Sequence, residues 1–278
     1  LKDVQDDIDG QIKTTVAEVN QISKEIASLN ERIQLVEVQG TPSNDERDRR
    51  DLLLKQLGER IDITWAEGKD GMVTVTAGKT GILVSGSGAS DLKAEATGER
   101  DKVEIFFLGT GAPANITRQV TGGRLGGALE VRDQIVEDLL THVDKMAFTL
   151  ATEVNRAHVE GYDSVGRKGV LFFEMPMTEK GAATEIDLNK TIFNDVGRIA
   201  AGAAPGAIGD NTVANMISSL QYRQVMESGT STLDDYYNSQ VGQVGAISQR
   251  AMKSQESQKN VLGQLSHIRE SISGVSLD

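Results

Sequence analysis

The chain has 278 residues, of which 41 are acidic and 29 basic, and its formal net charge is −12 at pH 7. Because no Lys/Arg-rich block interrupts this acidic balance, nucleic acid and anionic membrane surfaces are not expected as partners. Cysteine is absent, which excludes a disulfide framework, a thiolate metal site and a cysteine nucleophile. Aromatic residues make up only 4% of the chain, which favours an elongated shape over a deep globular interior.

The two ends of the sequence suggest a piece of a longer protein. The chain begins at Leu1 without an initiator Met, and both ends run in helical register. We therefore expect an internal fragment whose native ends, with any export signal, are missing. No apolar run approaches the roughly 20 residues that span a bilayer, and no leader pattern is visible, so neither a membrane anchor nor a general secretory signal is predicted.

Residues 1–38 are predicted to form one long helix with a coiled-coil seam. From Thr15 onward, apolar positions alternate steps of four and three, which is the spacing of a heptad repeat. An additional step of four upstream is a stutter that locally unwinds a supercoil. The predicted seam of this helix contains Val19, Ile22, Ile26, Leu29 and Ile33.

A second helix is predicted after the break GTPSNDE, because Pro42 cannot continue a helix and Ser43 with Glu46 fits a capping box. Its charged start is interpreted as a solvated face with i,i+4 ion pairs, each contributing a few tenths of a kcal/mol. The sharper alternative is an inter-domain clamp that uses Arg50. The candidate clamp residues are Asp45, Asp48, Arg50 and Asp51.

Between Ile61 and Val120 the apolar period changes to two, which is typical of strands, and the glycine-containing segments EGKDG, GSGAS and GTGAPA separate the alternating stretches. A small antiparallel sheet domain is predicted there. After it, four glycines lie within six residues where the helical period returns. These candidate domain-joint residues are Gly122, Gly123, Gly126 and Gly127.

The glycine stretch fits neither common phosphate-binding motif. No Lys-Ser/Thr follows the second glycine pair, as a Walker loop requires, and the Gly-x-Gly spacing of a dinucleotide fingerprint is absent. We interpret Gly122 and Gly123 as permitting a sharp change from strand to helix, and Gly126 and Gly127 as allowing close backbone packing at the helix start.

From Asn211 to the end the chain is predicted to be almost entirely helical, with a break around ESGTSTLDD (Glu227 to Asp235), and steps of four and three continue from Tyr237. Small or amide residues at several of these positions predict a seam that packs closely but weakly and requires a partner helix. Its predicted residues include Val244, Ala251, Leu262 and Leu265. The first helix is the only long partner in the chain, so the two ends are expected to meet.

These elements predict an α+β fold, with an elongated helical bundle or coiled coil from both chain ends and an inserted small β-rich domain. The expected bundle domain is discontinuous and comprises residues 1–60, 121–166 and 209–278. The expected β-rich outer domain comprises residues 61–120 and 167–208.

No catalytic, cofactor-binding or metal-binding residue is predicted. The three histidines form no His-x-x-x-His pair, and the segment DDIDG lacks the flanking carboxylates that a calcium loop needs. No Gly-x-Ser-x-Gly nucleophile motif occurs, and no acidic pair lies in an apolar sequence setting suited to acid–base chemistry.

Five motifs in order resemble the flagellar hook-associated protein 1 family, the first junction proteins between bacterial hook and filament. SNDERDRRDLLLKQLGERIDI resembles the family's Asn-Asp-x-x-Asp-x-Arg-Asp-x-Leu-Leu segment. GGRLGGALEVRD resembles a second segment, with Arg124 where lysine is common. The remaining motifs are VNRAHVEGYDSVG followed by LFF, then GDNTVANMISSLQ, and last SISGVSLD.

The resemblance covers nearly the whole chain and implies a helical bundle continuous with the flagellar tube wall, carrying an inserted β-rich domain. Larger members carry a further domain between the FF and GDN motifs. Only about 35 residues separate Phe173 from Gly209, so that outermost domain is expected to be absent.

The function implied by the resemblance is a non-enzymatic adapter that joins hook to filament and transmits torque, without a cofactor. The implied partners are the hook protein, the next hook-associated protein on the filament side, further copies in a ring and an export chaperone. The implied location is extracellular, at the hook–filament junction, after export by the flagellar type III system. Two alternatives stay open: another axial protein (flagellin or the third hook-associated protein), or a hydrolase carried on the axial scaffold, with carboxylates in 61–120 or 167–208.

Overall fold

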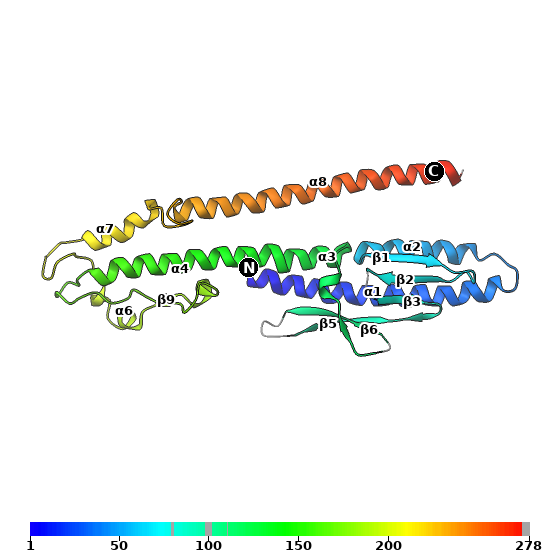
Figure 1. Cartoon of the computed structure of the whole chain (residues 1–278), viewed down its shortest axis with the longest axis horizontal. Coiled ribbons are helices and arrows are strands. Elements are labelled where there is room, and N and C mark those ends of the chain that lie inside the picture. Colours follow the sequence, from blue (N-terminus) through cyan, green and yellow to red (C-terminus); the bar gives the residue numbers. More distant parts are fainter. Residues whose placement is uncertain (79–80, 98–101, 110, 274–278) are drawn as a thin grey trace. The chain divides into compact units, whose positions relative to one another are not determined.

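The computed structural model describes residues 1–78, 81–97, 102–109 and 111–273 (Figure 1). The chain divides into two compact units, Leu1–Asp138 and Leu139–Asp278, here called unit 1 and unit 2. Both contain helices and short antiparallel strands, and unit 1 begins with a long helix. The predicted α+β class is therefore confirmed.

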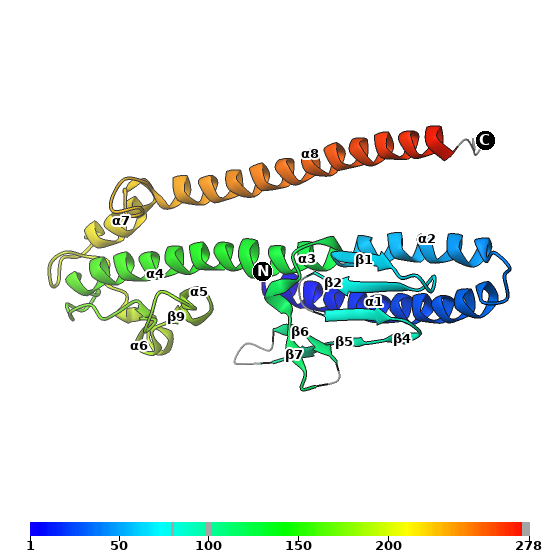
Figure 2. The same ribbon diagram turned by 45° about the vertical axis from the view of Figure 1, so that its right-hand side comes forward.

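Unit 1 combines long helices with two small sheets. Its helical elements are α1 (Lys2–Glu37), α2 (Asn44–Arg60), the 3₁₀ turn η1 (Thr117–Gln119), α3 (Gly123–Glu130) and the π-helical turn η2 (Val131–Val136). Its strands are β1 (Ile63–Glu67), β2 (Val73–Ala77), β3 (Gly81–Ser85), β4 (Gly88–Ala89), β5 (Asp91–Ala96), β6 (Val103–Leu108) and β7 (Ala114–Asn115). β1 to β4 form one antiparallel sheet in chain order, and β5 to β7 form a second. The strands lie along α1 and α2 (Figure 2).

The long helix α1 carries the core of unit 1 on one face. The predicted seam residues of α1 are all buried, where the helix packs against α2, α3 and strands β3 to β6. Burying an aliphatic side chain of this size stabilises a fold by about 1.5–3 kcal/mol, so this face is a major source of unit 1 stability. A coiled coil between this seam and the C-terminal section stays a prediction.

Strand β2 and the start of β6 bury every second residue, as a period of two predicts. In β2, Val73, Val75 and Ala77 are buried and the intervening threonines are not. In β6, Val103 and Ile105 are buried in the same alternation. The antiparallel strands predicted for residues 61–120 are therefore confirmed.

An asparagine on α1 holds the second sheet against the helix. The Asn20 side chain donates to the carbonyl oxygen of Leu92 (2.8 Å) and accepts from the backbone N–H of the same residue (2.7 Å). One amide thus replaces the two hydrogen bonds that a neighbouring strand would give to β5.

Unit 2 is built around α4 (Glu137–Glu160), whose first two residues belong to unit 1. The other elements are β8 (Phe173–Glu174), α5 (Ala182–Glu185), β9 (Asp187–Leu188), α6 (Lys190–Asn194), η3 (Val196–Arg198), α7 (Thr212–Ser218), η4 (Ser219–Tyr222) and α8 (Leu233–Ser273). Residues 274–278 of the last sequence motif lie outside the described residues.

Two polar side chains of α4 fix the segment that follows it. Asn155 accepts the N–H groups of Phe172 and Phe173 (both 2.8 Å) and donates to the carbonyl oxygen of Phe173 (3.0 Å). The buried His158 accepts the N–H of Ala200 at Nε2 (2.8 Å), so its Nδ1 carries the proton and donates to the carbonyl oxygen of Val170 (2.6 Å). Backbone segments distant in sequence are thereby tied to one helix.

The expected domain grouping differs from the division into units. Residues 61–120 and 167–208 were expected to form one outer domain, but the former belong to unit 1 and the latter to unit 2. The strands of residues 61–120 belong to unit 1 because the inner faces of β2 and β6 are buried together with α1. The grouping into a bundle and an outer domain stays a prediction.

In the GDN motif of unit 2, Asp210 closes a tight loop. Its Oδ2 accepts the N–H of Ala203 (2.7 Å), and its Oδ1 accepts the hydroxyl (2.6 Å) and N–H (3.0 Å) of Thr212. The side-chain bond from Thr212, followed by the backbone bonds, lowers the pKa of Asp210 from its ordinary value of 3.8 to about 2. All of these bonds favour the ionised carboxylate.

We expect this loop to weaken in acid. Because the pKa of Asp210 is lower in the folded state, the ionised group stabilises the fold above about pH 4, and that contribution is lost as the pH falls toward about 2. An NMR titration of the Asp210 carboxyl carbon should have its midpoint near 2. The Asp210→Asn variant should lack this part of the acid dependence of unit 2 unfolding. A midpoint near 3.8 would contradict the prediction.

Candidate functional site

The predicted clamp residues separate into one buried side chain and three exposed ones. Arg50 is 2% exposed, and its Nη1 donates to the carbonyl oxygen of Gly71 (2.6 Å) and to Asn30 Oδ1 (3.2 Å). Its Nη2 lies 3.3 Å from Glu67. Asp45, Asp48 and Asp51 are exposed on α2. These contacts of Arg50 lie within unit 1, and its role as an inter-domain clamp stays a prediction.

Asn30 on α1 is the centre of this cluster. Its side chain donates to the carbonyl oxygens of Val73 and Gly86 (both 2.8 Å) and accepts the N–H of Val73 (3.0 Å). With the bond from Arg50, one fully buried amide joins α1, α2, the first residue of β2 and the turn after β3. Asn30 follows the seam residue Leu29 and lies one turn from Ile26 and Ile33, so its sequence signal is a polar residue beside the apolar stripe.

Sequence reasoning also missed Arg47, which lies one turn before Arg50. Arg47 donates two hydrogen bonds to the carboxylate of Glu37 (2.6 and 2.8 Å) and one to Glu67 (2.6 Å). The bidentate bond from Arg47 lowers the pKa of Glu37 below its ordinary value. The i,i+3 spacing of the two arginines could have indicated their shared face.

Three of the four joint glycines are required by the close approach of other atoms, which belong to the backbone at Gly123 and Gly126 and to a side chain at Gly122. A Cβ at Gly123, whose φ is +67°, would lie 2.5 Å from the backbone carbon of Arg60, and one at Gly126 would lie 2.4 Å from the backbone carbon of Thr121. A Cβ at Gly122 would lie 2.8 Å from the Asp62 side chain. A Cβ at Gly127 meets no described atom within 4 Å, so close packing does not explain that glycine.

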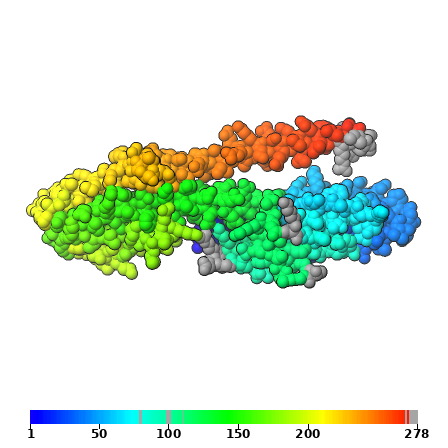
Figure 3. Space-filling view, viewed as in Figure 1, coloured from blue at the N-terminus to red at the C-terminus, as the bar shows by residue number. Residues whose placement is uncertain are grey.

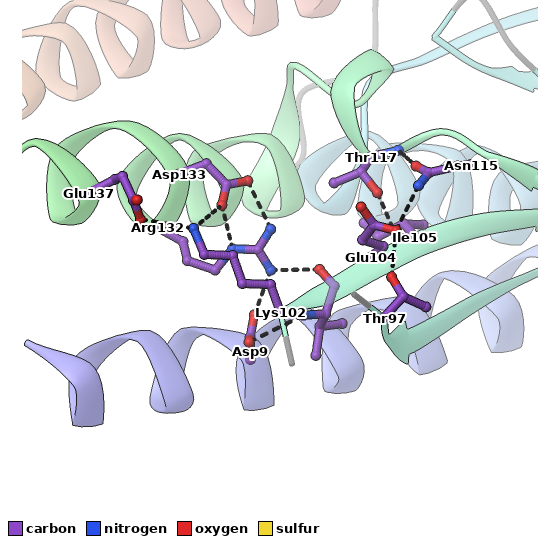
Figure 4. A network of polar contacts seen from close by, with 11 residues as sticks. Asp9, Thr97, Lys102, Glu104, Ile105, Asn115, Thr117, Arg132, Asp133 and Glu137 are labelled. Atoms are coloured by element: carbon purple, nitrogen blue, oxygen red, sulfur yellow. Dashed lines mark hydrogen bonds and ion pairs between the residues drawn. The ribbon is translucent and has the colours of Figure 1, made fainter. Parts of the chain in front are cut away.

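A buried arginine network lies just beyond the glycines (Figure 4). Arg132, in the π-helical turn η2, is 1% exposed. Its Nη1 donates to Asp9 on α1 (2.5 Å) and to the carbonyl oxygen of Val103 on β6 (2.6 Å). Its Nε and Nη2 donate to the two carboxylate oxygens of Asp133 (both 2.8 Å). Arg132 therefore connects α1, β6 and η2.

Lys102 supports the same network from the start of β6. Its ammonium group lies 3.0 Å from Glu137, which directly follows η2, and 3.7 Å from Asp133 within η2. Asp9 also accepts the N–H of Val103 (3.3 Å). Sequence reasoning missed Arg132 and Asp9, since nothing local in the sequence pairs two residues 123 positions apart.

A separate polar cluster in Figure 4 joins the strands of the second sheet. Glu104 accepts hydrogen bonds from Thr97 (2.5 Å) and from Asn115 (2.9 Å), and Thr117 accepts the N–H of Ile105 (2.8 Å). These bonds connect β6 to Thr97, to β7 and to η1, so the polar groups of this cluster are paired within unit 1 and the cluster is interpreted as structural.

The helix α8 presents apolar side chains to solvent along most of its 41 residues. Its first turns pack in unit 2, where the Tyr236 hydroxyl lies 2.6 Å from His142 Nδ1 and the Lys145 ammonium lies 5.4 Å from the ring centre. Residues 241–268 are exposed, and the side chains are uncovered on the face in view (Figure 3). The predicted seam residues are among them: Val244 is 39% exposed, Leu262 65% and Leu265 55%, and Ala251 is also exposed.

Within residues 1–78, 81–97, 102–109 and 111–273, no group of three His, Asp or Glu side chains could hold a metal ion. In the same described ranges, no helix has the length and apolar character needed to cross a membrane.

Comparison with known proteins adds an independent line of argument. The sequence model of the flagellar hook-associated protein FlgK helical domain matches residues 1–173. Flagellar hook-associated protein 1 of Bacillus subtilis (strain 168) is 27% identical over 307 aligned residues, which cover 100% of this chain and 61% of that protein. The protein of the same name from Salmonella typhimurium is 28% identical over 181 residues, which cover 63% of this chain and 32% of that protein.

A solved structure agrees. The flagellar hook junction protein FlgK from Burkholderia pseudomallei matches with a TM-score of 0.57 and 25% identity, over 61% of this chain and 31% of that chain. Against these relatives, the matched part of this chain spans from 31% to 61% of their length. The family match extends through both sheets, the glycine joint, the Arg132 network and α4. The chain therefore belongs to the flagellar hook-associated protein 1 (FlgK) family.

Proposed function

We propose that this chain forms the core of a structural subunit that joins hook to filament in the bacterial flagellum and transmits torque without catalysis. The proposal rests on the exposure of α8. Its apolar residues between 241 and 268 are exposed, and they recur in the steps of four and three that are typical of packed helices. A helix of this kind is stabilised by a partner helix rather than by water. Membership of the flagellar hook-associated protein 1 family supports assembly of this subunit in the flagellum.

The names of the relatives, hook-associated protein 1 and hook junction protein, support a set of proposed partners. They are the hook protein on one side, the next hook-associated protein on the filament side, and further copies of the same subunit in a ring. Export through the flagellar type III system with a chaperone, and an extracellular location, belong to the same proposal.

Other axial proteins are the second candidate, but the relatives described above are named hook-associated protein 1 or hook junction protein. A hydrolase is disfavoured because carboxylates of the two suspected segments hold the fold together, as Glu104 does in the second sheet. Incubation with peptidoglycan and peptide substrates tests the non-catalytic part. Turnover that one acidic-residue substitution abolishes would overturn it.

The assembly test uses α8 in the native protein, expressed from its own locus. The double variant Leu262→Asp/Leu265→Asp should abolish incorporation at hook tips and motility, because two charges would enter a helix–helix contact. Circular dichroism of the 278-residue chain should be unchanged, since both side chains are exposed there. Asn260→Asp/Gln264→Asp, two exposed changes on the opposite side of the same helix from the predicted seam, is the control. Normal motility and junctions in the leucine variant would refute the assembly role of α8.

A further inference from the structure

A π-helical turn interrupts the helical run between α3 and α4. Residues Val131–Val136 form η2, with α-helix on both sides, and unit 1 ends at Asp138, two residues after it. A π-turn bonds each N–H to the carbonyl five residues earlier, so it holds one residue more than an α-turn. Such turns are rare, and they occur often at functional positions.

The local sequence of η2 does not require this geometry. VRDQIV contains neither glycine nor proline, the residues that usually disturb a helix. The turn instead carries Arg132, whose guanidinium bonds reach α1, β6 and Asp133. Glu137 at its C-terminal side is held by Lys102. Tertiary ionic contacts thus bind the π-turn at both of its sides.

We propose that η2 is a torsional joint whose π-turn is held by Arg132. When the Arg132 contacts break, the turn relaxes to an α-helix with the same number of residues. Each residue of an α-helix turns the chain by about 100°, so absorbing the additional residue rotates α4 by about 100° around its axis relative to α3. A surface side chain on α4 then moves by roughly 8 Å, given a helix of about 10–12 Å diameter.

The joint goes beyond the proposed function and does not depend on it. It is a property of η2 and its neighbours in unit 1. If the subunit does transmit torque, the joint would let α4 turn about its own axis at η2, close to the end of unit 1 at Asp138.

The test compares a substitution that removes the contacts of the π-turn with a deletion that removes its additional residue. Arg132→Met removes the contacts, and the π-turn is expected to relax and rotate α4. Deleting Gln134, which is exposed, removes the additional residue, so the turn becomes α-helical while α4 keeps its native orientation. The double variant should therefore restore the native orientation, which a merely damaged network could not do.

The readout is a distance distribution between two spin labels, at Lys55→Cys on α2 and Thr152→Cys on α4, both exposed positions. The chain contains no cysteine, so labelling is specific. We expect the Arg132→Met distribution to shift by several ångström, and those of the Gln134 deletion and the double variant to superimpose on the parent. Arg124→Met, an exposed arginine on α3, is the matched control and should leave the distribution unchanged.

Two results would overturn the joint: a parental distribution in folded Arg132→Met, or a shift that the Gln134 deletion fails to reverse. Circular dichroism and the fluorescence of Trp65 verify that unit 1 is folded. If Arg132→Met unfolds unit 1, Asp9→Asn replaces it in the same design, because that change removes the charge that Arg132 meets on α1. These readouts need no flagellar assembly, so failure of the joint and failure of the proposed function are distinguishable.

Discussion

Replacing Gly126 with alanine is expected to destabilise unit 1 by about 1–3 kcal/mol, while the same change at Gly127 is neutral or stabilising by up to about 1 kcal/mol. The two glycines are adjacent on α3, yet a Cβ at Gly126 lies 2.4 Å from the backbone carbon of Thr121, whereas the Cβ at Gly127 meets no described atom within 4 Å. The backbone must move for one variant and not for the other. Helix propensity alone would stabilise both alanine variants by the same amount.

The fluorescence of Trp65 can measure the difference in stability between the two glycine variants. Trp65 is the only tryptophan of the chain and lies on β1, so urea unfolding followed by its fluorescence reports on unit 1. A lower urea midpoint for Gly126→Ala than for Gly127→Ala is expected. Equal midpoints would show that α3 can shift away from Thr121 without loss, and would remove the packing explanation for the second glycine pair.

The second large effect is expected at Asn30. Asn30→Ala should destabilise unit 1 by about 3–5 kcal/mol, because it leaves the buried backbone groups of Val73, the half-buried carbonyl of Gly86 and a guanidinium N–H of Arg50 without their partner. Trp65 fluorescence again measures the change. Proteolysis of the loop around Gly71 should accelerate in parallel.

Asn20→Ala is the matched control for Asn30. Asn20 lies on the same helix, also serves one strand residue through two hydrogen bonds, and is half-buried rather than fully buried. We expect a loss of about 1–2 kcal/mol there. If the two variants lost equal stability, the additional bonds of Asn30 would contribute nothing beyond strand docking.

Local patterns predicted the elements well where one physical cause dominates. The heptad spacing placed α1 within one residue of its observed ends, and alternation placed the strands of residues 61–120. Ser43 is the N-cap of α2 as predicted, but the capping box does not form, because the Ser43 side chain makes no cap hydrogen bond and its hydroxyl donates to the Glu46 carboxylate instead (2.8 Å). In each case, neighbours within a few residues determine the outcome.

The contacts that organise the candidate site are long-range, and local patterns could not predict them. Arg50 looks like its neighbours in NDERDRRD, and only the sheet above α2 explains why it is buried while Asp48 is exposed. The pairing of Arg132 with Asp9, and the π-turn that carries it, likewise depend on how β6 packs against α1. A heptad indicates that α8 requires a partner, but not which helix it is.

The two asparagines of α1 give unit 1 a mechanical property. The strands run along α1 (Figures 1 and 2), and Asn20 and Asn30 bind separate sheets at points ten residues apart. A force that pulls α1 lengthwise loads both sets of bonds at once, in shear, whereas a force that lifts one strand breaks them in succession. Unit 1 should accordingly resist sliding of α1 far better than peeling of its sheets, a directional strength suited to an axial load.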